Sequence, residues 1–167
     1  MLRFFKALSI LVMTFALLQT TAYAGDNHSS HGAKAHGGDI AVSDAWIRAG
    51  LPNRPTAGYL MLKNSGDADD RLLEVRSPAF KIIELHESKM EDGVMKMAPI
   101  VAIEVAAGGM AMLKPGGKHL MMFGGKDLSE GTEIEVTLIF EKAGEVTLTV
   151  PVVKRGGGHG HHGKHKK

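Results

Sequence analysis

Apolar and polar residues alternate with a period of two along the last part of the chain. Residues 132–141 place an apolar side chain at every second position, and residues 145–153 do the same after the turn-forming run Lys142-Ala143-Gly144. This period is that of a β-strand with one buried face. No stretch after residue 24 keeps the 3.6-residue period of an amphipathic helix for three turns. We therefore predict an all-β fold.

Earlier in the chain, short runs with the same β character are separated by Gly, Pro, Asn and Asp. These residue types favour turns because they adopt backbone conformations that other residues avoid. Many short strands joined by such turns are typical of an antiparallel sandwich or barrel. The runs are residues 40–48, 57–63, 71–76, 81–87, 94–98, 100–105, 110–113 and 119–123.

The first 24 residues have the pattern of a secretory signal peptide. Arg3 and Lys6 precede an apolar run at residues 7–18, and Ala22 and Ala24 form a small-x-small cleavage site. The run is shorter than the ~20 residues that a spanning helix needs, so cleavage after Ala24 is favoured over an uncleaved anchor. The chain has no cysteine and hence no lipobox. We predict export to a bacterial periplasm, with no membrane attachment after cleavage.

Two His-containing segments flank the predicted domain. Residues 25–38 and 156–167 are small and polar, and we interpret them as flexible arms around a folded domain at residues 39–155. Inside that domain the histidines are His86 and His119. The histidines of the two arms are His28, His31, His36, His159, His161, His162 and His165.

The composition excludes several classes of protein. The 20 Lys and Arg nearly balance the 18 Asp and Glu, which argues against a nucleic-acid-binding surface. Without cysteine, the chain cannot form a thiolate zinc site, an iron–sulfur cluster, a catalytic thiol or a cysteine-based copper centre. It contains no phosphate-binding glycine loop and no nucleophile elbow. We therefore expect a protein that is not an enzyme.

The two histidines of the domain each have a methionine within reach. His119 and Met121 are two positions apart on a predicted strand, so their side chains share one face. If residues 90–93 form a four-residue hairpin loop, Lys89 pairs with Val94 and His86 pairs directly with Met97. Opposite residues of an antiparallel pair have Cβ atoms about 5 Å apart. The sequence thus predicts two imidazole–thioether pairs.

Two such pairs form a donor set suited to copper. Thioethers are soft, neutral ligands that favour Cu(I) over Mg, Ca or Zn, and imidazole binds copper in either oxidation state. A site of this kind needs no open position for a substrate, which indicates carriage of the metal rather than turnover.

The alternative is that these residues are structural. A histidine on a strand is commonly a hydrogen-bonded structural residue, and methionine commonly fills gaps in a core. Under this alternative, the chain would be an adhesion-type sandwich that holds no copper. We expect Met61, Met110, Met112 and Met122 to be core residues, and leave open whether Met90 or Met95 ligates a metal.

The spacing of these residues matches a known motif. His86, Met97, His119 and Met121 follow the pattern H-x10-M-x21-H-x-M, and the chain resembles the PCuAC family of periplasmic copper chaperones from Ile40 to Val153. The segments that share this resemblance are Asp44–Arg48, Ala57–Tyr59, Asp70–Leu73, Glu84–Glu87 and Leu113–Met121. One departure is Gly124-Gly125, where we expect a bulkier residue in the second position.

The resemblance implies a cupredoxin-like antiparallel β-sandwich with Greek-key connections. It also implies one Cu(I) bound by His86, Met97, His119 and Met121. Family members are implicated in delivering copper to the CuA centre of cytochrome c oxidase subunit II, together with Sco-type copper proteins. Some carry a His-rich C-terminal extension that binds Cu(II), which residues 159–165 resemble. The alternative function that remains open is periplasmic copper storage or detoxification.

Overall fold

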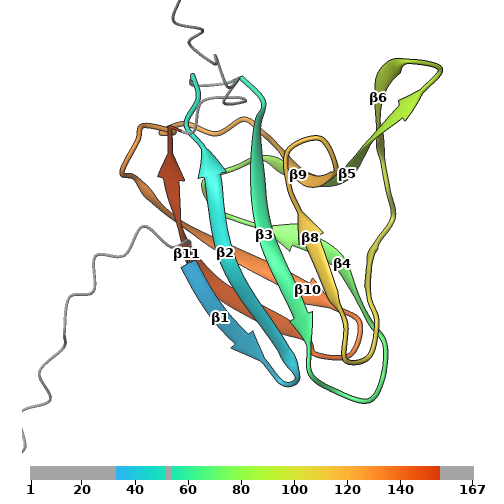
Figure 1. Ribbon diagram of the computed structural model, residues 1–167. Coiled ribbons are helices and arrows are strands. Elements are labelled where there is room, and N and C mark those ends of the chain that lie inside the picture. Colours follow the sequence, from blue (N-terminus) through green and yellow to red (C-terminus); the bar gives the residue numbers. More distant parts are fainter. Residues whose placement is uncertain (1–32, 52–53, 155–167) are drawn as a thin grey trace, which may run out of the picture.

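A computed structural model describes residues 33–51 and 54–154 (Figure 1). Within these ranges every regular secondary-structure element is a β-strand, in agreement with the predicted all-β fold. The strands are β1 (Ala33–Gly37), β2 (Ile40–Arg48), β3 (Thr56–Asn64), β4 (Asp70–Arg76), β5 (Ile82–Glu91), β6 (Val94–Pro99), β7 (Ile103–Val105), β8 (Met110–Leu113), β9 (Lys118–Phe123), β10 (Glu133–Phe140) and β11 (Glu145–Val153).

The strands form a β-sandwich. Their hydrogen-bonded order is β6-β5-β9-β3-β2-β11-β10-β4-β7, with β1 added to β2 and β8 added to β3. This continuous sheet folds back on itself, so that β2, β3 and β8 form a layer in front of β4 and β10 (Figure 1). Among the described strands β11 and β2 are paired in parallel, and the other pairs are antiparallel.

The core lies between the two layers. Alternate residues of β2 and β3, such as Val42 and Leu62, point toward alternate residues of β4 and β10, such as Leu72 and Leu138. All four are at most 1% exposed. Burying a side chain of this size stabilises the fold by roughly 1.5–3 kcal/mol. The period-two pattern that predicted the strands is therefore also the pattern that fills the core.

Residues 33–37 differ from the prediction, which placed them in a flexible arm. They form β1, which pairs with β2 from Ala33 to Gly37, and His36 is an exposed strand residue opposite Ala41. A strand at a sheet edge is held by backbone hydrogen bonds, which do not require large apolar side chains. The predicted signal peptide, the rest of the N-terminal arm and the His-rich tail lie outside the described residues.

Three methionines lie on the outer face of the front layer, and we call them the outer methionines: Met61, Met110 and Met112. Met112 pairs with Met61, while Met110 and Met112 are 68% and 55% exposed. The prediction that Met61, Met110 and Met112 are core residues is therefore wrong, although Met61 is half-buried. The inner positions of β8 are taken by Ala111 and Leu113, so alternation sends the two methionines outward. Met122 is fully buried, as expected.

One hairpin leaves the body of the sandwich. Strand β9 pairs with β5 at residues 82–87, and the remainder of β5 pairs with β6 alone. As a result the β5–β6 hairpin projects beyond the edge of the two layers (Figure 1), and all six residues of β6 are exposed. Within the described ranges, no helix has the length and hydropathy needed to cross a bilayer.

Candidate metal site

The β5–β6 hairpin turns at Asp92-Gly93, instead of through the four-residue loop predicted. Both residues have positive φ, 52° and 78°, as a type I′ turn requires and as the Asp-Gly pair favours. Ser88 therefore pairs with Met97, and the predicted direct pairing of His86 with Met97 is wrong by two positions. A shift of two keeps every side chain on its face. His86 and Met97 thus still share one face of the hairpin.

Strand β9 adds the other two candidate ligands to this face. His86 lies opposite His119, and Glu84 lies opposite Met121. The two imidazole centroids are 5.8 Å apart. The β5–β6 hairpin and the more distant strand β9 therefore bring His86, Met97, His119 and Met121 to one surface.

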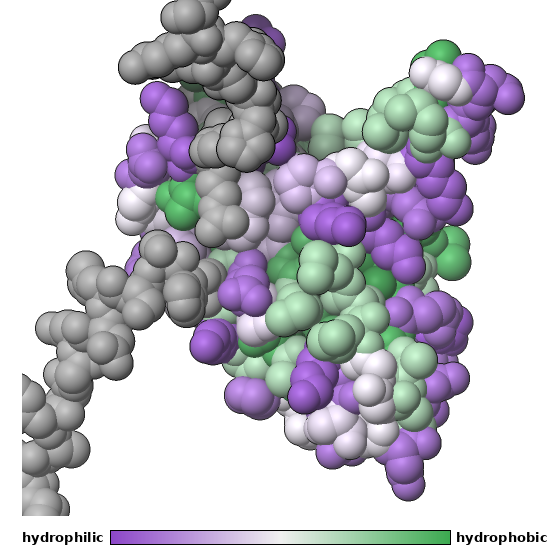
Figure 2. Space-filling model, viewed as in Figure 1, coloured by the Kyte–Doolittle hydropathy of each residue, from purple (hydrophilic) through white to green (hydrophobic). Residues whose placement is uncertain are grey.

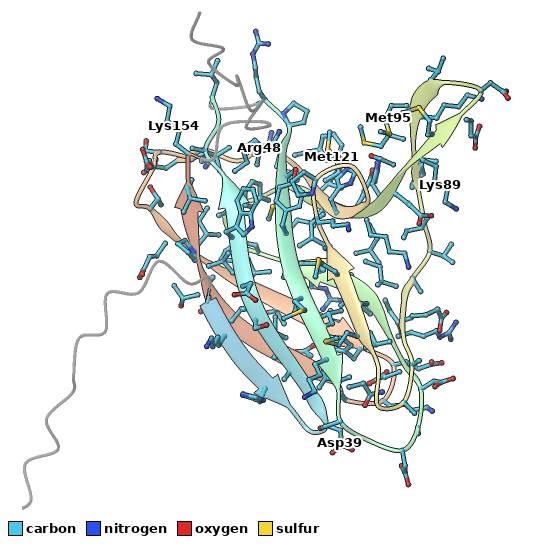
Figure 3. All side chains as sticks on the ribbon, viewed as in Figure 1. Asp39, Arg48, Lys89, Met95, Met121 and Lys154 are labelled. Carbon is cyan, nitrogen blue, oxygen red and sulfur yellow. The ribbon has the colours of Figure 1, made fainter. Side chains whose placement is uncertain are left out.

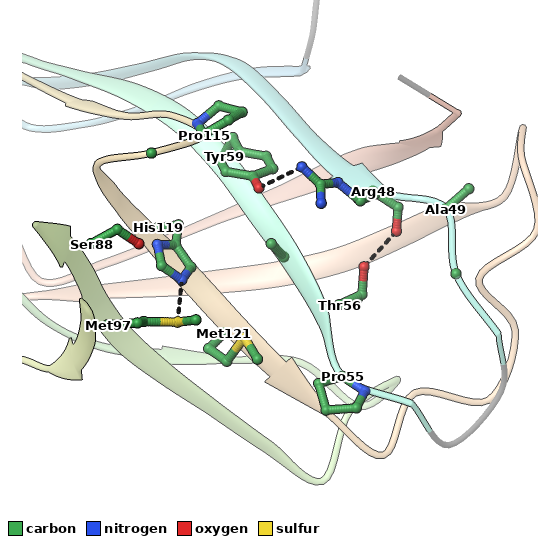
Figure 4. Close-up of a pocket in the computed structure, with 13 residues that line it drawn as sticks. Arg48, Ala49, Pro55, Thr56, Tyr59, Ser88, Met97, Pro115, His119 and Met121 are labelled. Atoms are coloured by element: carbon green, nitrogen blue, oxygen red, sulfur yellow. Dashed lines mark hydrogen bonds between the residues drawn. The ribbon is translucent and has the colours of Figure 1, made fainter. Parts of the chain in front are cut away.

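His119 is held in one orientation. Its Nδ1 donates to the carbonyl oxygen of Gly117 at 3.0 Å, so the neutral ring carries its lone pair on Nε2. That Nε2 lies 3.2 Å from Sδ of Met97 (Figure 4). A thioether sulfur is itself a lone-pair donor and carries no proton. Two electron-pair donors thus face each other, and both can donate to one soft cation bound beside them.

His86 has the opposite arrangement of its ring nitrogens. Its Nε2 is 2.8 Å from a carboxylate oxygen of Glu84, which accepts a hydrogen bond from it. Its Nδ1 is buried and has no hydrogen-bond partner. An unpaired buried polar atom is costly unless something binds it. The Nδ1 atom of His86 is therefore available to a metal, with Glu84 fixing the tautomer through the other nitrogen.

Exposure decreases from the hairpin toward β9. Met97 is 52% exposed, whereas His119 is 6% exposed. Met121 is half-buried. The candidate site therefore has an open side formed by the hairpin and a closed side formed by the sandwich.

A pocket of about 360 Å³ adjoins this site, lined in part by Met97, His119 and Met121 (Figure 4). On its far wall Arg48 donates to the hydroxyl of Tyr59 at 3.0 Å. Burial raises the pKa of Tyr59, although Arg48 opposes this effect. The phenol therefore stays neutral near neutral pH, and the charge that Arg48 brings to the pocket is positive.

The donor types distinguish this site from the common carboxylate and thiolate centres. Among residues 33–51 and 54–154, no group of three His, Cys, Asp or Glu side chains could hold a metal ion. Here two imidazoles are combined with two thioethers. This set is soft and electrically neutral, and it suits a monovalent soft cation better than a hard divalent one.

Sequence reasoning missed two groups that orient the histidines. Glu84 lies two positions before His86, so strand alternation alone places both on one face and could have identified the contact. The Gly117 carbonyl could not have been found in this way, because its contact with His119 depends on the local turn geometry.

The unexpected Gly125 has a packing explanation. A Cβ atom there would lie 2.5 Å from the ring of Phe80 and 3.1 Å from Leu128. The Phe80 ring therefore occupies the space that a larger side chain at position 125 would take. None of these contacts involves the candidate ligands.

Comparison with known proteins identifies the family and the fold. The family model described as "LpqE-like: Putative lipoprotein LpqE-like" matches residues 40–152. A curated relative, "Putative lipoprotein Lxx21020" of Leifsonia xyli, is 28% identical over 152 residues, which cover 90% of each chain.

Solved structures with the same fold include the copper-bound PCuAC domain from PmoF2. It is 29% identical, with a TM-score of 0.63, and the match covers 73% of this chain and 98% of that domain. The solution structure of CuI-DR1885 from Deinococcus radiodurans is also 29% identical, with a TM-score of 0.50 over 66% of this chain and 76% of that one. The chain belongs to the LpqE-like family, and its described domain has the cupredoxin-like β-sandwich fold of PCuAC domains.

Proposed function

We propose that this protein is an exported copper chaperone that binds Cu(I) through His86, Met97, His119 and Met121 and passes it to a partner. The observation that carries the proposal is the 3.2 Å approach of Met97 Sδ to the lone-pair nitrogen of His119. The solved relatives support it, since one is described as copper-bound and another as the CuI form.

The chain's own groups prepare the two imidazoles for a cation. The Gly117 carbonyl keeps the Nδ1 proton of His119 away from the site, and the Glu84 carboxylate does the same for the Nε2 proton of His86. Each ring then presents one lone pair without having to lose a proton. We propose that His119 binds through Nε2 and His86 through Nδ1.

The type of ligand favours the monovalent ion. The four donors are neutral, and the two thioethers are soft ligands that prefer Cu(I) to a harder divalent ion. Of the nearby charges, Arg48 at the adjoining pocket is positive and the Glu84 carboxylate bonded to His86 is negative, so they act in opposite directions.

The gradient of exposure supports transfer by ligand exchange. Met97 is half exposed and sits on the projecting hairpin, so a partner's donor can replace it first. His119 is buried and hydrogen-bonded, and it is expected to release the ion last. Such a carrier performs no bond chemistry, which supports a protein that is not an enzyme.

The finer expectations rest on the family resemblance. We propose that the protein works in the periplasm and that it delivers copper to the CuA centre of cytochrome c oxidase, together with Sco-type proteins. We further propose that the tail at residues 156–167 captures Cu(II). Deletion of the protein should then lower oxidase activity. A storage protein would instead leave oxidase normal and make cells copper-sensitive.

A Cu(I) competition titration tests the site directly. The chain from Gly25 onward should form a tight one-to-one complex, and the double variant Met97→Leu plus Met121→Leu should lose most of that affinity. The matched control is Met61→Leu plus Met112→Leu, which removes an opposed pair of thioethers elsewhere on the surface. Equal affinity in both double variants would overturn the proposed ligand set.

A further inference from the structure

Two more methionines lie on the same face as the candidate ligands, and we call them the hairpin methionines: Met90 and Met95. They pair directly across the hairpin, two positions beyond the Ser88–Met97 pair. They are 63% and 53% exposed, and no core residue covers them. Their sulfurs carry no role in the four-ligand site.

The hairpin is amphipathic, although neither of its faces is buried. Its opposite face carries charged residues, with Lys89 bonded to Glu87 and Lys96 to Glu91, each at 2.8 Å. In Figure 3, Met95 lies on the side of the hairpin that faces Met121, and Lys89 lies on the other side. A solvated hairpin does not need methionines for stability, because they leave apolar surface in water.

The turn determines which side chains meet. Because Asp92-Gly93 closes a two-residue turn, Met90 and Met95 are opposed, with Cβ atoms about 5 Å apart. Met95 and Met97 are two positions apart on β6, a separation of about 7 Å. Each thioether extends on three rotatable bonds, so neighbouring sulfurs along this face can bind one ion in succession.

We propose that Met90 and Met95 form a second, weaker Cu(I) site, through which the ion reaches and leaves the four-ligand site. This inference rests on the proposed function. Exposure falls along this path, from Met90 and Met95 at the tip, through Met97, to His119 at 6%. The ion therefore moves from an exposed two-sulfur site to a buried site that adds nitrogen donors.

Each step exchanges one dative bond for another. The bond between Cu(I) and a hairpin thioether breaks as the bond to the Met97 sulfur forms, and the imidazole nitrogens then bind with their lone pairs. Copper stays monovalent, and no proton or electron moves. The step requires no oxidant, reductant or co-reactant.

The outer methionines provide the contrast within the same molecule. Met61 and Met112 are also opposed on neighbouring strands, and Met112 is as exposed as Met95. Along their face, however, Met61 is followed by Lys63 and no histidine of the described residues pairs with them. If exposure of a methionine pair were sufficient, both pairs would behave alike.

Methyl NMR of the chain labelled at the methionine ε-carbons tests this directly, with Cu(I) as the probe under reducing conditions. The first equivalent should shift the methyl signals of Met97 and Met121, and the second should shift those of Met90 and Met95. The Met61 and Met112 signals should not move up to two equivalents. If Met90 and Met95 do not shift, or shift no more than Met61 and Met112, the second site does not exist. If Met97 and Met121 do not shift at the first equivalent, the proposed function fails instead.

Transfer kinetics provide the second measurement. In the double variant Met90→Leu plus Met95→Leu, the equilibrium affinity of the first site should be unchanged. Release to a Cu(I) chelator should slow by roughly tenfold, because a neighbouring thioether acts at high effective concentration. The variant Met61→Leu plus Met112→Leu should release at the wild-type rate. Leucine keeps the apolar surface, so unchanged release from the hairpin variant would overturn the path and indicate an apolar docking face.

Discussion

Two groups of methionines on this protein differ in what surrounds them. The hairpin methionines lie beside Met97 on a face that also carries His86 and His119, whereas the outer methionines lie beside Lys63. Met90, Met95, Met110 and Met112 are more than half exposed, whereas Met61 is half-buried, and Figure 2 shows an apolar patch on the front layer. The difference teaches that exposed thioethers alone do not define a metal site. The imidazoles and their hydrogen-bond partners distinguish the two.

Removing an imidazole from the face that carries the hairpin methionines should have the largest effect on Cu(I) affinity. We expect His119→Leu to lower Cu(I) affinity by more than ~100-fold, above the range found when only an outer partner of a ligand is lost. A competition titration measures this, with Met112→Leu as the control. A loss of less than about tenfold, or 1.4 kcal/mol, would mean that His119 is not a ligand.

Adding an imidazole beside the outer methionines should make their surface bind Cu(I) more like the surface that carries His86 and His119. Lys63 is exposed, lies opposite Met110 and is two positions from Met61 on the same face. We expect Lys63→His, in the background of Met97→Leu plus Met121→Leu, to strengthen Cu(I) binding at least about tenfold, roughly 1.4 kcal/mol. The same background with Lys63→Gln should show no gain. Identical binding by both variants would show that imidazole is not the deciding difference.

Loss of the contact between Glu84 and His86 should have an intermediate effect on Cu(I) affinity. Glu84→Leu leaves His86 Nε2 without its acceptor, and we expect Cu(I) affinity to fall by roughly 10–100-fold. Glu84→Gln keeps an acceptor oxygen and should lose much less. Nitrogen-15 NMR of His86 should show the Nε2–H tautomer in the wild-type protein and a mixture of tautomers in Glu84→Leu. Unchanged tautomers would remove the proposed positioning role.

A substitution in the hairpin turn should have the smallest effect on Cu(I) affinity. Gly93 has φ of 78° and open space around the position of a Cβ, so Gly93→Ala costs mainly conformational strain, about 1 kcal/mol. The control Gly144→Ala has φ of 74° and the same open space, in a turn between β10 and β11. Urea unfolding should show equal losses of stability. We expect weaker Cu(I) binding, by a few-fold, in Gly93→Ala alone.

Much of the fold was predictable, because strand periodicity is a local property. The alternation in residues 132–153 identified β10 and β11 and the turn between them, and the other strand runs lie within a few residues of their observed bounds. Strand β1 was missed because its small residues carry no apolar pattern, and pairing with β2 alone reveals it. Met110 and Met112 were misplaced because a four-residue strand does not tell which of its faces is inner.

The candidate site was predictable in its residues and only partly in its geometry. Alternation placed His119 beside Met121, and the Asp92-Gly93 turn, read as two residues rather than four, would have predicted the observed register. The contact of His86 with Glu84 could also have been predicted from strand alternation, because the two residues are two positions apart. The 3.2 Å approach of Met97 to His119 was not, because the two residues lie on β6 and β9, which both flank β5 and do not pair with each other.

Local alternation along the chain is sufficient to decide that this protein is built of strands and which side chains share a face on each. A side chain's face follows from the backbone period of its own strand, and no other part of the chain is needed. The tertiary structure decided that β5 lies between β6 and β9, which proton each histidine keeps, and which methionines remain exposed. These features depend on pairing between distant strands, and local periodicity carries no information about it.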